Sequence, residues 1–304
     1  MRSALVASLL CLGLALAGAQ SPRPGQPPIF AVRVESVLID AFVTNDGDPV
    51  PGLTARDFVL KDNGVAQPFD LLPAEALPIR ALLVFDTSSS MQGAKLDRLR
   101  AAAQSFLERL RPHDEVALVS FSDEITWRTP LTDDRAAVRR GLESLQPRGA
   151  TSAFDALFSA LVVPRSAQRT LVVVFSDGED MTSWLGAKQI QGAVERSNAL
   201  IHVVAARSED FQSGFISTYR SSDSAHMRTW RTLSTITGGS LIEVKSPDRI
   251  AAAFSQIVDQ MKNRYVLRYT PEDEPASGWH ALDLQLTSRK GRVRGRTGYW
   301  VEKR

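Results

Sequence analysis

Three oxygen-bearing side chains stand at alternate positions directly after an apolar run in the first third of the chain. They are Asp86, Ser88 and Ser90, and the run that precedes them is 81–85. A carboxylate and two hydroxyls are thus placed where a buried strand is expected to end. Ligands of open parallel sheets bind in the crevice beyond the carboxyl ends of the strands. Oxygen donors suit Mg²⁺, Mn²⁺ or Ca²⁺ better than zinc, so the spacing predicts part of a site for a hard divalent cation.

A second carboxylate and a further hydroxyl stand in comparable positions later in the chain. Asp177 lies just beyond the apolar run 171–175, and Gly178 after it permits a sharp turn. Thr151 lies in the small-residue stretch 149–152, immediately before a segment expected to be helical. If these segments meet at one edge of a sheet, two carboxylates and three hydroxyls are available to one cation.

The spacing of apolar residues changes twice along the chain and predicts the fold class. Apolar residues alternate with polar ones up to about residue 76, with a turn at Asn63-Gly64, which indicates β-structure. From residue 79 to 263, short apolar runs alternate with stretches of helical spacing. Continuous apolar runs such as 171–175 and 201–205 are typical of parallel strands covered on both faces. The sequence therefore predicts an α/β, doubly wound (Rossmann-like) domain over residues 78–262.

Two β segments flank this domain, at residues 29–76 and 263–304. Each is too small to bury a core of its own. We expect them to pack together as one small sandwich-like module, with the α/β domain inserted between them in the chain. Separate docking of each segment on the α/β domain is the alternative.

The first residues predict export. Arg2 precedes an apolar stretch over residues 4–17, and Ala17-Gly18-Ala19 resembles a cleavage site. We interpret residues 1–19 as a signal peptide cleaved near Ala19, and residues 20–28 as a Pro/Gly-rich linker. The apolar stretch is short for a membrane span, although a membrane anchor is the alternative, and no later segment approaches one. We expect a secreted or periplasmic protein without a transmembrane span in the mature chain.

Composition and motifs argue against several classes of function. The chain has 36 Lys and Arg against 34 Asp and Glu, so no nucleic-acid partner is expected from its net charge of +2. Its single cysteine, Cys11, lies in the predicted leader, which leaves no thiol chemistry for the mature chain. The sequence contains no GxxxxGK[ST] or HExxH motif and no recognisable pair of nucleophile and base. We therefore do not expect an enzyme.

The order and spacing of the oxygen donors resemble a known adhesion motif. Asp86-x-Ser88-x-Ser90, Thr151 and Asp177-Gly178 together resemble the metal-ion-dependent adhesion site (MIDAS) of von Willebrand factor type A (VWFA) domains. The resemblance covers about residues 78–262, and the flanks look like a secreted bacterial subgroup. It implies that the first four residues lie in or near the inner shell of Mg²⁺ (or Mn²⁺ or Ca²⁺), while Asp177 often acts through water.

A cation held in this way is incompletely neutralised if one carboxylate acts only through water. A vacant coordination position then favours an Asp or Glu carboxylate from a partner protein. The sequence thus predicts a secreted or periplasmic, metal-dependent protein-binding module for adhesion or scaffolding. Two alternatives stay open. One is a Mg²⁺-dependent phosphohydrolase-like enzyme, which usually needs a second acid where Ser88 stands. The other is a metal-independent envelope scaffold protein.

Three further features of the sequence bear on the predicted binding surface. Glu179 and Asp180 are expected to be solvated, with a second ion as the alternative. Trp184 follows Asp177 by seven residues and is expected at the rim of the site. We expect the polar stretch 208–224 to be disordered. The alternative is that its aromatic residues contact a partner.

Overall fold

The computed structural model describes residues 36–162, 168–177, 180–206, 225–271, 277–287 and 291–302. The predicted signal peptide, the predicted linker, Gly178, Glu179 and the stretch 208–224 lie outside the described residues. Among the residues described, no helix is both long and apolar enough to cross a bilayer.

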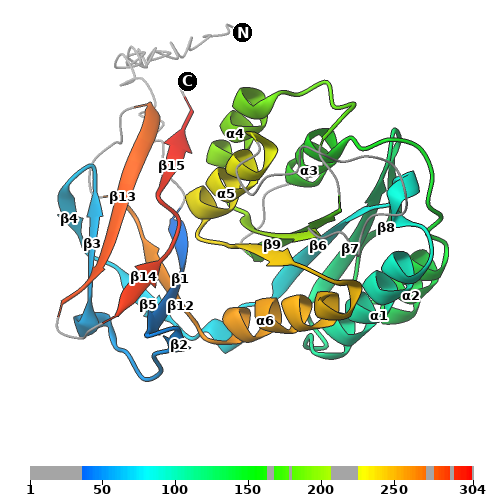
Figure 1. The fold of residues 1–304 in the computed structure, drawn as a ribbon. Helices are drawn as coiled ribbons and strands as arrows, with labels where there is room; N and C mark the ends of the chain where they lie inside the picture. The colour runs from blue at the N-terminus through cyan, green and yellow to red at the C-terminus, as the bar shows by residue number, and fades with distance from the viewer. Residues whose placement is uncertain are drawn as a thin grey trace, which may run out of the picture. The chain divides into compact units, whose positions relative to one another are not determined.

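A six-stranded sheet forms the centre of the α/β part, in the order β11-β10-β9-β6-β7-β8 (Figure 1). Its strands are β6 (Ile79–Asp86), β7 (Glu115–Phe121), β8 (Ile125–Thr132), β9 (Arg169–Ser176), β10 (Leu200–Ala206) and β11 (Leu241–Val244). All neighbours pair in parallel except β8, an antiparallel edge strand. The prediction of a doubly wound α/β fold is confirmed.

Helices cover both faces of this sheet (Figure 1). Alternate residues of β6 point to opposite faces, so Leu83 and Phe85 belong to one hydrophobic cluster while Leu82 and Val84 belong to another. The first cluster is completed by α1 (Ala94–Glu108), α2 (Arg135–Glu143) and α6 (Ile250–Lys262). The second is completed by α3 (Ala153–Leu161), α4 (Ala187–Arg196) and α5 (Ala225–Thr237). Burial on both faces explains why the central strands are continuously apolar.

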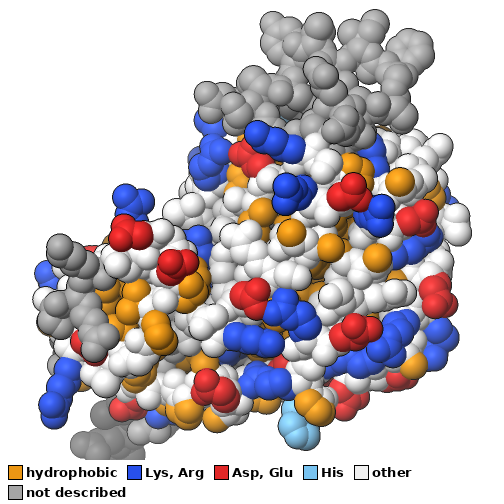
Figure 2. Space-filling model, turned by 60° about the horizontal axis from the view of Figure 1, so that its bottom comes forward, with side chains coloured by type: hydrophobic (Ala, Val, Ile, Leu, Met, Phe, Trp, Pro, Cys, Tyr) orange, Lys and Arg blue, Asp and Glu red, His pale blue; other side chains and the backbone are white. Residues whose placement is uncertain are grey.

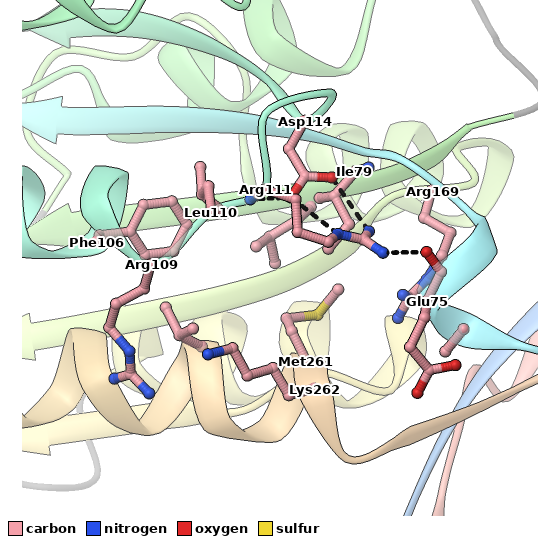
Figure 3. A pocket seen from close by; sticks show the side chains of 13 residues that line it. Glu75, Ile79, Phe106, Arg109, Leu110, Arg111, Asp114, Arg169, Met261 and Lys262 are labelled. Carbon is pink, nitrogen blue, oxygen red and sulfur yellow. Dashed lines mark hydrogen bonds and ion pairs between the residues drawn. The ribbon is translucent and has the colours of Figure 1, made fainter.

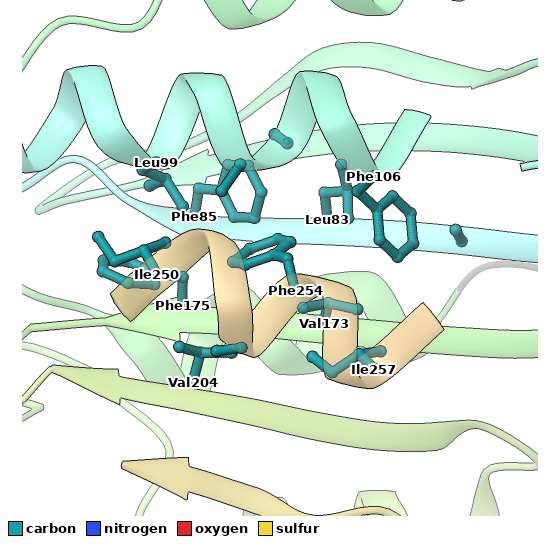
Figure 4. Packing of buried hydrophobic residues seen from close by; sticks show 14 of the residues in the cluster. Leu83, Phe85, Leu99, Phe106, Val173, Phe175, Val204, Ile250, Phe254 and Ile257 are labelled. Atoms are coloured by element: carbon teal, nitrogen blue, oxygen red, sulfur yellow. The ribbon is translucent and has the colours of Figure 1, made fainter. Parts of the chain in front are cut away.

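Aromatic rings fill the space between α1, α6 and the sheet (Figure 4). The ring of Phe254 on α6 lies edge-on to Phe85 of β6 and to Phe106 of α1, with centroid distances of 5.7 and 6.2 Å. Such geometry is favoured for aromatic pairs. This packing fixes β6, the strand that ends at Asp86.

Two smaller sheets combine strands from both ends of the chain. One has the order β14-β1-β12-β5, with β2 paired to β1, and the other has the order β15-β13-β3-β4. Their strands are β1 (Val37–Asn45), β2 (Asp48–Pro49), β3 (Phe58–Asp62), β4 (Val65–Gln67), β5 (Asp70–Leu72), β12 (Arg264–Tyr269), β13 (Gly278–Leu286), β14 (Arg292–Arg294) and β15 (Gly298–Val301). Inner residues of both sheets share one hydrophobic cluster. The domain boundaries given above remain predictions.

The turn predicted at Asn63-Gly64 joins β3 to β4. Both residues have positive φ, 47° and 85°. A two-residue hairpin loop of this kind favours Asn-Gly, because glycine adopts positive φ without a steric cost.

A buried carboxylate lies at the centre of the polar contacts between the strands from the two ends of the chain. Asp62 Oδ2 accepts hydrogen bonds from the hydroxyls of Tyr269 and Tyr299, at 3.0 and 2.8 Å. The Nδ1 atom of His280 lies 3.1 Å from Asp62 Oδ1. All four side chains are buried, so Asp62 supplies both tyrosine hydroxyls with an acceptor away from bulk water.

Asp62→Ala is expected to lower the free energy of unfolding by about 3 kcal/mol, because it leaves buried hydroxyls without an acceptor. Urea denaturation measures this change. Asp283→Ala on the neighbouring strand β13 is the control, since Asp283 is exposed. A surface change of this kind is expected to stay within about 0.5 kcal/mol. Equal losses of unfolding free energy in the two variants would show that the Asp62 cluster does not stabilise the fold.

Candidate metal site

Asp86 is the last residue of β6 and is fully buried. Its Oδ1 accepts a hydrogen bond from the backbone N–H of Ser88, and its Oδ2 accepts one from the hydroxyl of Ser176, both at 2.8 Å. Burial, and then the negative charge of Asp177, raise the pKa of Asp86 to about 6. A buried carboxylate with a second carboxylate nearby gains from an adjacent cation.

A chain of hydroxyls connects the Asp86 loop to Asp177. Ser88 Oγ lies 3.0 Å from Ser90 Oγ, and the Ser90 hydroxyl donates to Asp177 Oδ1 at 2.7 Å. Asp177 follows β9 directly and is 2% exposed. The structure therefore brings four of the five predicted ligands together at the carboxyl ends of the neighbouring strands β6 and β9.

Thr151 follows a loop that lies against the Asp86 loop. The loop before it is held against the Asp86 loop by hydrogen bonds from Ser89 N–H to Gly149 O at 3.0 Å and from Arg148 N–H to Thr87 O at 2.7 Å. Gly149 has a φ of 70°, a backbone conformation that L side chains rarely adopt, so glycine suits this position. These contacts place the buried residue Thr151 near the cluster.

Lys95 is a member of the cluster that the sequence analysis missed. Its ammonium donates to Asp177 Oδ2 at 2.9 Å and to the backbone oxygen of Ser90 at 2.8 Å. The residue is 7% exposed. A signal was present, because Lys95 stands four residues before the buried Leu99 and therefore on the inner face of α1.

The loop after Asp177 is fixed to the start of α3. Asp180 Oδ2 accepts from the backbone N–H of Phe154 at 2.8 Å, and the carboxylate of Asp155 accepts from the N–H groups of Trp184 and Leu185 at 2.8 and 3.0 Å. Asp180 is thus not the solvated residue that the sequence predicted, because it supplies an acceptor for orphan N–H groups at a helix start.

Two large apolar side chains project from this fixed loop. Trp184 is 95% exposed and Met181 is 75% exposed. The N–H groups of Met181 and Thr182 both donate to the carbonyl oxygen of Thr151, at 2.8 and 3.1 Å. The exposed side chains therefore border the loop that carries a predicted metal ligand.

The donor set fits a hard divalent cation. It offers carboxylate and hydroxyl oxygens from separate loops, which is the chemistry that Mg²⁺, Mn²⁺ and Ca²⁺ favour. Within the described ranges, no group of three or more His, Cys, Asp or Glu side chains is placed to hold a metal. The site is thus poor in carboxylates and relies on its hydroxyls, and Lys95 already binds one oxygen of Asp177.

The stability of the metal-free protein is expected to depend on pH through Asp86. Its pKa of about 6 in the folded state exceeds the ordinary value of 3.8, so between these values the folded protein holds a proton that the unfolded chain releases. The free energy of unfolding should therefore fall as pH rises from about 4 to 6, by about 3 kcal/mol at most. Urea denaturation in the presence of a chelator at several pH values measures this, and Asp86→Asn should remove it. If the unfolding free energies of the wild type and of Asp86→Asn changed in parallel with pH, Asp86 would not be the group responsible.

A separate cavity of about 350 Å³ lies at the amino ends of β6 and β9 (Figure 3). It is lined by Ile79 and Arg169, the first residues of these strands, and by side chains of α1 and α6. The Arg111 guanidinium in its wall lies 3.1 Å from Asp114 Oδ1. The cavity is therefore distinct from the metal-site cluster, which lies at the opposite ends of the same strands.

Acidic and basic side chains are intermingled on the face shown in Figure 2. This mixture differs from the single-sign basic surface that nucleic-acid binding requires. It agrees with the near balance of charges in the sequence.

Residues 81–179 match the family profile described as von Willebrand factor type A domain. Together with the doubly wound sheet, this match shows that the chain carries a VWFA domain, as the motif spacing predicted. The ligand set remains a prediction.

Two curated proteins are similar to less than half of this chain. Inter-alpha-trypsin inhibitor heavy chain H2 of Mus musculus is 29% identical over 137 residues, which are 40% of this chain and 14% of that protein. A UPF0353 protein of Mycolicibacterium paratuberculosis is 33% identical over 114 residues, covering 36% of this chain and 34% of that protein. The chain thus spans a small part of these relatives.

One solved structure is similar in fold and carries an occupied metal site. It is proximal thread matrix protein 1 from the mussel byssus with a zinc-occupied MIDAS motif. The TM-score is 0.51 at 14% sequence identity, over 64% of this chain and 48% of that one.

Proposed function

We propose that this chain is a secreted or periplasmic protein-binding module whose divalent cation receives a carboxylate from a partner protein. The cation would be held by Asp86, Ser88, Ser90, Thr151 and Asp177. The observation that carries the proposal is the hydrogen-bonded cluster of two buried carboxylates and two serine hydroxyls at the carboxyl ends of β6 and β9. It lies at the strand ends of a VWFA domain, where ligands of open α/β sheets bind.

The choice of Mg²⁺, or of Mn²⁺ or Ca²⁺, follows from the all-oxygen donor set. The mussel protein that holds zinc in its MIDAS motif supports a divalent ion in a related fold, so zinc belongs in the same binding assay. When bound, the cation would supply a positive centre for an incoming carboxylate. The residues of this chain would hold the cation in place and neutralise its charge only in part.

The exposed side chains of Met181 and Trp184 extend this binding surface. Exposed apolar groups next to a polar site are typical of protein interfaces, and tryptophan is enriched among the residues that dominate binding energy. The hydrogen bonds that fix this loop keep the entropic cost of binding low. We therefore expect a partner that offers both a carboxylate and an apolar surface.

The proposal is tested by capture from the native envelope fraction. Mature protein immobilised with Mg²⁺ should retain a partner that is released by EDTA, and Asp86→Asn should retain none in either condition. Capture that EDTA does not change would favour the metal-independent scaffold instead. Hydrolysis of phosphoesters with Mg²⁺, lost in Asp86→Asn, would favour the phosphohydrolase-like alternative.

A further inference from the structure

Lys95 places a fixed positive charge inside the candidate metal site. Its ammonium lies 2.9 Å from Asp177 Oδ2, and Asp177 Oδ1 accepts a hydrogen bond from the hydroxyl of Ser90 at 2.7 Å. The side chains of Lys95 and Asp177 are 8% and 1% exposed. Solvent therefore screens this ion pair only weakly.

The position of Lys95 in the helix is unfavourable for a cation. α1 begins at Ala94, so Lys95 is its second residue. The N-terminus of a helix carries a partial positive charge, which repels cations. A buried ammonium at a helix start needs a nearby anion to compensate for its charge, and Asp177 supplies one at 2.9 Å.

We propose that Lys95 makes uptake of the divalent cation depend on simultaneous uptake of a carboxylate. The inference rests on the proposed function and concerns the charge of the same site. Among the described side chains of this cluster, Asp86 and Asp177 carry two negative charges and Lys95 carries one positive charge. A divalent cation raises the sum of these charges to plus one, and one carboxylate from a partner brings it to zero. Without Lys95 the two carboxylates and the cation would already sum to zero.

This charge balance distinguishes two possible roles of Lys95, one in setting the charge next to the metal and one in holding the structure together. A lysine that only holds Asp177 in place would change stability, yet it would leave the response of metal binding to anions unchanged. A lysine that sets the charge of the site changes that response. A net charge is costly in a poorly hydrated site. The change in metal affinity caused by an anion therefore reports on the charge of Lys95.

The experiment is calorimetric titration of Mg²⁺ and of Mn²⁺ into the mature protein, in sodium acetate and in sodium chloride of equal ionic strength. Acetate is the carboxylate probe. We expect acetate to raise the metal affinity of the wild type at least fivefold, within the usual range of coupling between two sites. Lys95→Met should bind metal about tenfold more tightly than the wild type in chloride, and acetate should change its affinity less than twofold.

Arg98→Gln is the matched control. It removes one positive charge from the same helix, but the Arg98 side chain is 59% exposed and pairs with Asp248. Its titrations should match the wild type in both buffers. Lys95→Arg retains the charge and should retain the acetate dependence. If Lys95→Met does not fold, Lys95→Gln takes its place, with circular dichroism as the check.

The outcomes distinguish the two proposals. No metal uptake by the wild type in either buffer would overturn the proposed function. Metal uptake with the same acetate dependence in the wild type and in Lys95→Met would overturn only the inference on Lys95. Loss of thermal stability in Lys95→Met with unchanged acetate dependence would assign Lys95 a structural role and would also overturn it.

Discussion

Asp86→Asn is expected to weaken Mg²⁺ uptake at least a hundredfold while the fold stays intact. The substitution removes one of two carboxylates from the candidate site, and a full charge next to a divalent ion in a poorly hydrated site is worth several kcal/mol. Asparagine has the shape of aspartate and can still accept a hydrogen bond from Ser88 N–H or from Ser176. Alanine would be a poorer test, because Asp86 is fully buried at the end of β6 and its loss would remove the acceptor of the Ser88 N–H.

Calorimetry at pH 7.5 measures the metal affinity, and urea denaturation measures stability without metal. The metal-free variant should be at least as stable as the wild type, since the substitution removes a buried charge whose pKa is raised. Asp97→Asn is the control, because Asp97 lies near the same loop on α1 with its side chain 71% exposed. A metal affinity of Asp86→Asn within threefold of the wild type would exclude Asp86 as a ligand.

The sequence predicts the core of the candidate site because strand ends are visible in it. In the structure, Phe85 of β6 pairs with Phe175 of β9 in parallel register. The residues after these two positions therefore meet at one edge of the sheet. Since residues 81–85 and 171–175 are apolar, the first acidic residues that follow these runs mark the site. The positions of Asp86 and Asp177 are thus accessible to local pattern reasoning.

Helical spacing with Leu99 places Lys95 on the inner face of α1, but the contacts that Lys95 and Asp180 make could not be predicted from local patterns. A long lysine side chain at a helix start can extend to solvent or fold back, and the choice depends on an anion 82 positions away in the chain. Asp180 accepts a hydrogen bond from Phe154, 26 positions earlier. Both roles arise from tertiary contacts of single polar atoms, which leave no periodic trace in the sequence.

The pairing of strands outside the central sheet also could not be predicted from local patterns. Alternation of apolar residues predicts β-structure near residues 37–43 and 265–269, but it does not say which strands pair. In the structure, Val37 of β1 pairs with Tyr269 of β12 across more than half of the chain. Register over such a distance is set by packing and by specific polar contacts.

A buried ion pair joins β1 to the central sheet and gives the last prediction. The guanidinium of Arg169, the first residue of β9, donates through Nε to Asp40 Oδ1 at 2.8 Å. Arg264 donates to the backbone oxygens of Asp40 and Gly238, both at 2.8 Å. Burial lowers the pKa of Arg264 to about 9, while the charge of Asp40 acts in the opposite direction. Asp40 is therefore the counter-charge for two buried arginines.

Asp40→Ala is expected to lower the free energy of unfolding by about 3 to 5 kcal/mol, because it leaves buried guanidinium groups without a carboxylate. Asp70→Ala is the matched control, since Asp70 pairs with Arg268 on the same sheet but its side chain is 70% exposed. Exposed pairs of this kind contribute less than about 1 kcal/mol. Urea denaturation of both variants at pH 7 measures the difference. If Asp40→Ala costs no more than Asp70→Ala, the arginines must be hydrated in solution, and the ion pair would not hold β1 against β9.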